Sequence, residues 1–111
     1  MNLPRVALFP LMDAAEPLRH RAPAADEEGR PLSDFMMLIP GLRDRPRPMI
    51  QEVMSRIHSV LACFSDEVVF AELNIRLNLL WVSVRPVTGL RNAIACAVQD
   101  RVPEAKLVTH I

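Results

Sequence analysis

Residues 68–85 read VVFAELNIRLNLLWVSVR, and this stretch decides the fold. Two runs rich in strand-forming residues, 68–75 and 79–85, lie on either side of the short turn at 76–78. β-Branched and aromatic residues on both sides of a short turn are typical of a β-hairpin. Pro86 ends the second run, because proline cannot donate a hydrogen bond to a neighbouring strand.

Upstream of the hairpin, a strand and a helix are expected. Residues 35–39, FMMLI, form a continuous apolar run that ends at Pro40-Gly41, which is typical of a strand buried on both faces. Proline is favoured in the first helical turn, so a helix is expected to begin near Pro48. Its apolar residues recur at spacings of three and four, which places them on one side of a helix: Ile50, Val53, Met54, Ile57, Leu61 and Phe64.

Downstream of the hairpin, the pattern predicts a second helix and a last strand. The helix covers about 89–102, and Pro103 ends it. The strand covers 107–111. One side of this second helix is apolar, with Leu90, Ala93, Ile94, Ala97 and Val98.

The resulting order is strand, helix, strand, strand, helix, strand. This order predicts an α+β fold of the ferredoxin-like βαββαβ kind, a four-stranded antiparallel sheet with two helices on one face. Its usual strand order, 4-1-3-2, places the first and third strands in the centre. Those two strands are the most apolar here, whereas the second and fourth carry polar residues expected at edges, namely Glu72, Asn74, Lys106 and His110.

The chain divides into an N-terminal arm, residues 1–34, and the α+β domain, residues 35–111. The arm contains five prolines and an acidic centre, which disfavour regular structure. Residues 6–12 are more apolar than the rest of the arm. We expect this segment to dock on the domain or on a partner.

A loop between the first strand and the first helix resembles that of ACT-like regulatory domains. In this sequence it reads Asp44-Arg45-Pro46-Arg47-Pro48-Met49-Ile50. Arg47 occupies the place where those domains have a glycine that lets a ligand approach the backbone. The resemblance implies a ferredoxin-like fold and a ligand, an amino acid in that family, bound at this loop in a subunit interface.

The same loop is a candidate site for a small anionic ligand. Arg43, Asp44, Arg45 and Arg47 lie just before a helix N-terminus, where free N–H groups favour anions, and arginine matches carboxylates and phosphates in geometry. The alternative is a stiff, solvated loop whose arginines pair with Asp44 or with the acidic arm.

A second candidate is the sheet face that the helices leave open. Strand alternation places Val69, Ala71, Leu73, Leu80, Val82 and Val84 toward the helices. It places on the other face Phe70, Glu72, Asn74, Trp81, Ser83 and Arg85. Apolar patches with a polar rim usually mark interfaces, so we expect a homodimer with Trp81 in or beside the contact. Phe35, Met37 and Ile39 are expected to contribute to this face. The alternative is that the arm covers it within one chain.

An enzyme of the dimeric ferredoxin-like type is the second function considered. It would require Glu72, Asn74 and Arg85 to line one pocket, because chemistry needs a convergent polar cluster. No known catalytic motif supports this function, so no catalytic residue is assigned. His58 and Cys63, five residues apart on a helix, point in different directions and do not form a nucleophile–base pair. They are interpreted, with Cys96, as side chains at the helix margins.

Composition excludes several classes of function. The 13 basic and 13 acidic residues give a formal net charge of zero, which does not favour nucleic-acid binding. The spacing of the two cysteines does not match a metal site, so neither a metal nor a cofactor is expected. No apolar run is long enough to span a membrane. The few cysteines and the arginine-rich composition suggest a cytoplasmic bacterial protein.

Overall fold

The structure, a computed structural model of the whole chain, describes residues 5–9, 25 and 29–108. Its elements follow the predicted order after one additional strand. They are β1 (Arg5–Phe9), β2 (Ser33–Leu38), the 3-10 helix η1 (Leu42–Asp44), α2 (Arg47–Ala62), β3 (Val68–Asn74), β4 (Leu79–Val84), α3 (Leu90–Arg101) and β5 (Lys106–Val108).

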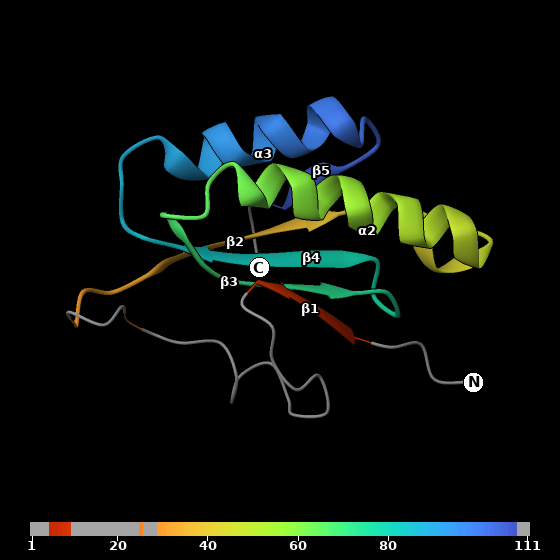
Figure 1. Cartoon of the computed structure of the whole chain (residues 1–111), viewed down its shortest axis with the longest axis horizontal. Helices are drawn as coiled ribbons and strands as arrows, with labels where there is room; N and C mark the ends of the chain where they lie inside the picture. Colours follow the sequence, from red (N-terminus) through yellow and green to blue (C-terminus); the bar gives the residue numbers. More distant parts are fainter. Residues whose placement is uncertain (1–4, 10–24, 26–28, 109–111) are drawn as a thin grey trace.

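All paired strands are antiparallel, and the sheet order is β1-β3-β4-β2-β5. Both helices lie on the same face of this sheet (Figure 1). The fold is therefore α+β, and two helices over an antiparallel sheet are compatible with the ferredoxin-like arrangement. The predicted first and third strands, β2 and β4, lie in the interior of the sheet as expected from their apolar sequences.

The prediction of a four-stranded sheet was wrong in one respect, because β1 adds a fifth strand. Arg5 pairs with Asn74 and Val6 with Leu73, so β1 occupies the outer edge of β3. The five-stranded order is consequently not that of the four-stranded ferredoxin-like sheet. Glu72 and Asn74 were expected to lie on an edge strand, but β3 is not at the edge of the sheet. β1 pairs with the backbone groups that an edge strand would leave exposed.

The core lies between the helices and one face of the sheet. α2 contributes Val53, Ile57, Val60 and Leu61, and α3 contributes Leu90, Ile94, Ala95 and Val98. β4 lies beneath them with Leu80, Val82 and Val84. The described helices, α2 and α3, lack the length and apolar content that a membrane span requires.

The pairing register corrects two predictions about which side chains face the helices. β3 contains a register shift between Val68 and Phe70, so Val68 and not Val69 is buried in the core. Such a bulge changes the alternation because it inserts one unpaired residue. Phe35, Met37 and Ile39 also belong to the core and not to the opposite face.

Most of the predicted N-terminal arm lies outside the described residues, which omit 10–24 and 26–28. The described part of residues 1–34 includes β1, the first two residues of β2 and an isolated antiparallel bridge between Ala25 and Pro31. The last strand begins at Lys106, one residue earlier than predicted, and residues 109–111 are not described.

Two leucines near the β3–β4 turn provide a test of this core. Leu80 is fully buried and Leu77 is 56% exposed. Leu80→Ala is expected to lower the free energy of unfolding by about 2–5 kcal/mol, because it leaves a cavity among packed side chains. Leu77→Ala is expected to change it by less than about 0.5 kcal/mol. Urea denaturation of both variants measures the difference, and equal losses would contradict the assigned register.

Candidate functional site

The loop between β2 and α2 is fixed at several points. Leu42 is fully buried and anchors η1 beneath the helices. Asn78, in the β3–β4 turn, accepts a hydrogen bond from the Arg43 backbone N–H at its Oδ1 atom, at 2.7 Å. The carbonyl oxygen of Asn78 accepts another from the backbone N–H of Ile39, at 2.8 Å. The loop therefore has a defined position against the neighbouring hairpin.

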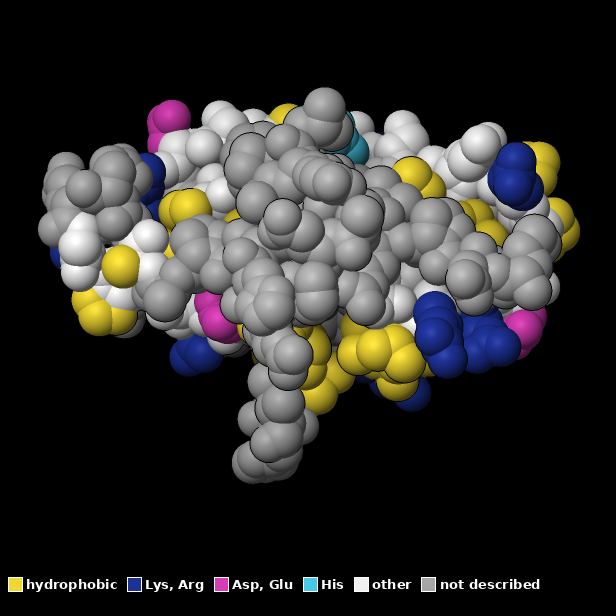
Figure 2. Space-filling view, turned by 90° about the horizontal axis from the view of Figure 1, so that it is seen from below, with side chains coloured by type: hydrophobic (Ala, Val, Ile, Leu, Met, Phe, Trp, Pro, Cys, Tyr) yellow, Lys and Arg dark blue, Asp and Glu magenta, His cyan; other side chains and the backbone are white. Residues whose placement is uncertain are grey.

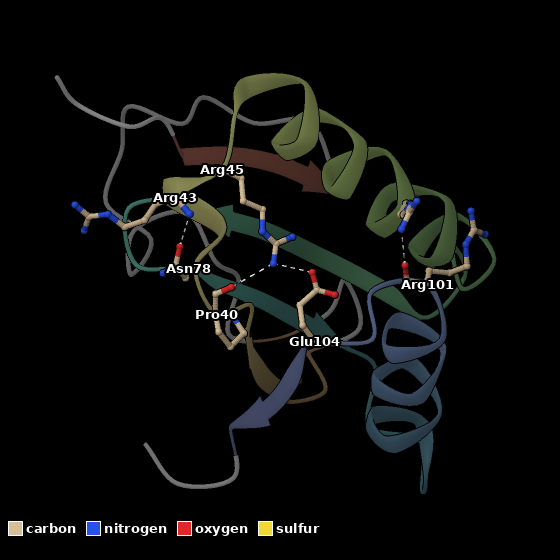
Figure 3. Close-up of polar contacts among 7 residues, drawn as sticks. Pro40, Arg43, Arg45, Asn78, Arg101 and Glu104 are labelled. Carbon is tan, nitrogen blue, oxygen red and sulfur yellow. Dashed lines mark hydrogen bonds and ion pairs between the residues drawn. The ribbon is translucent and has the colours of Figure 1, made fainter.

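Arg45 is held by two acceptors. Its Nη2 atom lies 2.7 Å from Oε2 of Glu104 and donates to the carbonyl oxygen of Pro40 at 3.2 Å (Figure 3). This ion pair joins the loop before α2 to the segment after α3. A hydrogen bond from the Glu104 backbone and the neighbouring Arg45 guanidinium lower the pKa of the Glu104 carboxyl, and partial burial opposes them.

The remaining members of the predicted anion site do not converge with Arg45. The Arg43 guanidinium points away from that of Arg45 (Figure 3) and donates to the carbonyl of Arg76 at 3.4 Å. The separation between Arg43 Nε and Asp44 Oδ1 is 3.9 Å, and both side chains are exposed. Arg47, the first residue of α2, is exposed. Arg43 and Arg45, two of the arginines predicted to act together, thus point in different directions.

A small cavity of about 190 Å³ lies between α2 and the segment after α3. Its lining contains two arginines and two glutamates together with three apolar side chains, namely Arg45, Met49, Glu52, Val53, Arg56, Val102 and Glu104. Arg56 donates from Nη2 to Glu52 Oε1 at 2.6 Å and from Nη1 to the carbonyl of Arg101 at 3.2 Å. The charges of this lining are therefore already paired within the chain.

The sheet face opposite the helices carries three cross-strand rows of side chains, because residues paired in antiparallel strands project to the same side. These rows alternate with the buried rows that face α2 and α3. They are Glu72–Trp81–Met36–Val108, Phe70–Ser83–Asp34 and Asn74–Leu79–Leu38–Lys106. Figure 2 looks onto this face, where hydrophobic side chains reach the surface in several places around atoms that are not described.

Burial on this face is uneven. Phe70, Glu72 and Ser83 are fully or almost fully buried, whereas Trp81 is half-buried. The Nε1 atom of Trp81 and the Oγ atom of Ser83 are buried and have no hydrogen-bond partner within the described part of the chain. An unsatisfied buried polar atom costs about 1–3 kcal/mol, so hydrogen-bond acceptors or donors supplied to these two atoms would stabilise this face.

The three polar residues proposed for an enzymatic pocket are not brought together. Asn74 lies at the turn end of the β3–β4 hairpin, where its Oδ1 accepts from the backbone N–H of Leu77 at 3.2 Å. Arg85 lies at the opposite end, and its Nε donates to the carbonyl of Asp66 at 2.9 Å. At about 3.3 Å per strand residue, most of the hairpin separates them. Glu72 lies between them and is buried.

The candidate nucleophiles and metal ligands are dispersed. His58, Cys63 and Cys96 are exposed, and both cysteines are unpaired. Cys63 donates from Sγ to the carbonyl of Ser59 at 3.5 Å, one helical turn away. Within residues 5–9, 25 and 29–108, no cluster of three His, Cys, Asp or Glu side chains suits a metal ion.

A larger cavity of about 340 Å³ lies at the other end of the sheet, where the start of β2 meets the β4–α3 loop. Polar and apolar side chains from three segments line it, namely Ser33, Pro86, Val87, Thr88, Gly89, Arg91 and Asn92. Gly89 adopts a φ of 79° at the start of α3, a conformation that favours glycine, so the loop can turn sharply into the helix.

Comparison with known proteins provides no relative: no family model, curated protein or solved structure matches the chain. The geometry of the described residues therefore carries the functional argument.

Sequence reasoning did not identify two residues that organise the loop before α2. Asn78 carries a signal that could have found it, because asparagine at a hairpin turn tolerates positive φ, and its φ here is 57°. Glu104 carries no such signal, since only the packing of α3 beside α2 brings it to Arg45. The cavity at Arg91 was missed for the same reason.

The Arg45–Glu104 pair predicts a pH-dependent contribution to stability. The side chains are 21% and 37% exposed, so Glu104→Gln is expected to lower the free energy of unfolding at neutral pH by at most about 1 kcal/mol. Because folding lowers the Glu104 pKa from 4.5, this contribution is present above that value and is lost as the pH falls through the lower folded-state value.

Chemical denaturation at neutral and acidic pH measures the effect. A double-mutant cycle with Arg45→Gln isolates the pair, and its coupling energy is expected to disappear at low pH. A coupling that does not change with pH would contradict the assignment.

Proposed function

We propose that the protein is a non-enzymatic binding and assembly module, a cytoplasmic bacterial homo-oligomer joined through the sheet face opposite the helices. In this proposal the domain is ferredoxin-like with one added edge strand. The unpaired state of Cys63 and Cys96 supports a reducing compartment.

The observation that carries the proposal is the apolar character of this face outside the core. Met36 and Leu38 from β2, Leu79 and Trp81 from β4, and Val108 from β5 are all half-buried and share one side of the sheet. A face of an antiparallel sheet that met only water would carry mainly polar side chains. Burying such side chains in a contact stabilises it by up to about 1.5–3 kcal/mol each.

The two unpartnered polar atoms support the same proposal. Tryptophan is enriched at interfaces because its large apolar ring carries an N–H donor that seeks an acceptor. Trp81 Nε1 and Ser83 Oγ have no such partner among the residues that the structure describes. An interface that rearranges this face and supplies acceptors to both would remove the cost of leaving them unsatisfied.

A second copy fits this face better than a nucleic acid. Asp34 is an exposed acidic member of its cross-strand rows, and the net charge of the chain is zero. A phosphate backbone would be repelled by the Asp34 carboxylate, whereas a two-fold contact can place Lys106 of one copy near Asp34 of the other.

A small anionic ligand at the loop before α2 is the second part of the proposal. Arg43 and Arg47 retain exposed guanidinium groups there, beside Asp44. Arg45 would take part only by exchanging Glu104 for the ligand.

Trp81→Glu tests the assembly. The wild type is expected to sediment as a dimer at micromolar concentrations, and Trp81→Glu as a monomer, because a carboxylate in an apolar contact must be desolvated. Met36→Glu, the neighbour on β2, is expected to act in the same way. Leu77→Glu, at an exposed position in the β3–β4 turn, serves as the control and should remain dimeric. A wild type that is monomeric under these conditions would refute the proposed contact.

A further inference from the structure

The cavity beside the start of β2 is large enough for a small ligand. Its volume of about 340 Å³ lies at the lower end of the range for small-molecule pockets, which is about 300–1,000 Å³. Ser33 contributes from β2, Pro86 and Val87 from the loop after β4, and Arg91 from α3. Side chains far apart in the sequence therefore surround one space.

The polar side chains of this cavity can all donate hydrogen bonds. Among the described lining residues, Arg91 alone is charged, and Ser33, Thr88 and Asn92 add two hydroxyls and an amide. No carboxylate from the described residues lines the cavity. The smaller cavity beside α2 differs in this respect, because its arginines face an equal number of glutamates. The charge of Arg91 is thus available to a ligand of opposite sign.

The guanidinium of Arg91 has one whole edge free. Its Nη1 atom donates to the carbonyl oxygen of Asp34 at 3.4 Å, and Arg91 makes no other polar contact within the described part of the chain. Its Nε and Nη2 atoms share the other edge of the planar group. Two parallel N–H donors on one edge match the two oxygens of a carboxylate or a phosphate.

One wall of the cavity is apolar. Val87 is 56% exposed, one of three large hydrophobic side chains with such exposure in the described residues, and Pro86 precedes it. An anion with a small apolar body would cover Val87 while its oxygens reach Arg91. An inorganic ion alone would leave that wall exposed.

We propose that this cavity, formed by Ser33, Pro86, Val87, Thr88 and Arg91, binds a small organic oxyanion, a carboxylate or a phosphate monoester. The Arg91 guanidinium binds the oxyanion through its Nε–Nη2 edge, the hydroxyls of Ser33 and Thr88 donate further hydrogen bonds, and Val87 contacts the apolar part. The site does not depend on assembly through the sheet face, and it lies apart from the loop before α2.

The test is a titration of the full-length protein, followed by NMR of backbone amides. Phenyl phosphate and benzoate provide the two oxyanions on the same apolar ring, and uncharged benzamide is the control. Either oxyanion is expected to shift the amides of Ser33 and residues 88–92 saturably at about millimolar concentrations, and the more effective one identifies the ligand class. Equal shifts with benzamide, or no saturable shift with either oxyanion, would overturn the proposal.

Variants locate the site. Arg91→Gln is expected to weaken binding about tenfold or more, since it removes a charge-assisted, two-point contact. Val87→Asp is also expected to weaken binding about tenfold or more, because its carboxylate repels the anion. This second variant tests the site even if Arg91→Gln folds poorly. Arg101→Gln, at an exposed arginine that ends α3, should leave the affinity within about twofold. A loss in Arg101→Gln without one in Arg91→Gln would refute this site.

Discussion

Both helices pack on one face of the sheet, and this packing constrains the rest of the molecule. The apolar sides of α2 and α3 meet the inward rows of β2, β3 and β4 in a single buried layer. Successive strand residues alternate between the two faces of the sheet. The residues before and after each buried strand residue therefore lie on the opposite face. The residues that pack under the helices therefore also determine which side chains lie on the opposite face. The apolar side chains on that opposite face create the need for a cover or a partner.

The addition of β1 covers one edge of the sheet. β3 would present unpaired backbone groups at one margin, and the antiparallel pairing of Arg5–Phe9 satisfies them. At the other margin, the described part of β5 carries an exposed lysine, Lys106, a residue type that disfavours further strand addition. Association through the face therefore fits this sheet better than association through its edges.

The arginines at the two ends of the domain differ in their polar contacts. Beside α2, Arg45 and Arg56 are paired with glutamates and with backbone carbonyls, so their charges stabilise the chain. Arg91, in α3, has one long hydrogen bond and lines a cavity. A count of arginines along the sequence favours the loop before α2 as an anion site, but in the described residues Arg45 of that loop is already paired with Glu104.

The sequence by itself determined the element order, the two amphipathic helices and the sides of most strand residues, because these follow from local periodicity. It also identified Trp81 as a member of the face opposite the helices. Only the tertiary structure decided that β1 joins the sheet, that the bulge at Val69 turns Val68 inward, and that Glu104 meets Arg45. The physical reason is that these features depend on which distant segments pack together. Local propensity limits the conformation of each segment, but it does not determine which other segments that segment packs against.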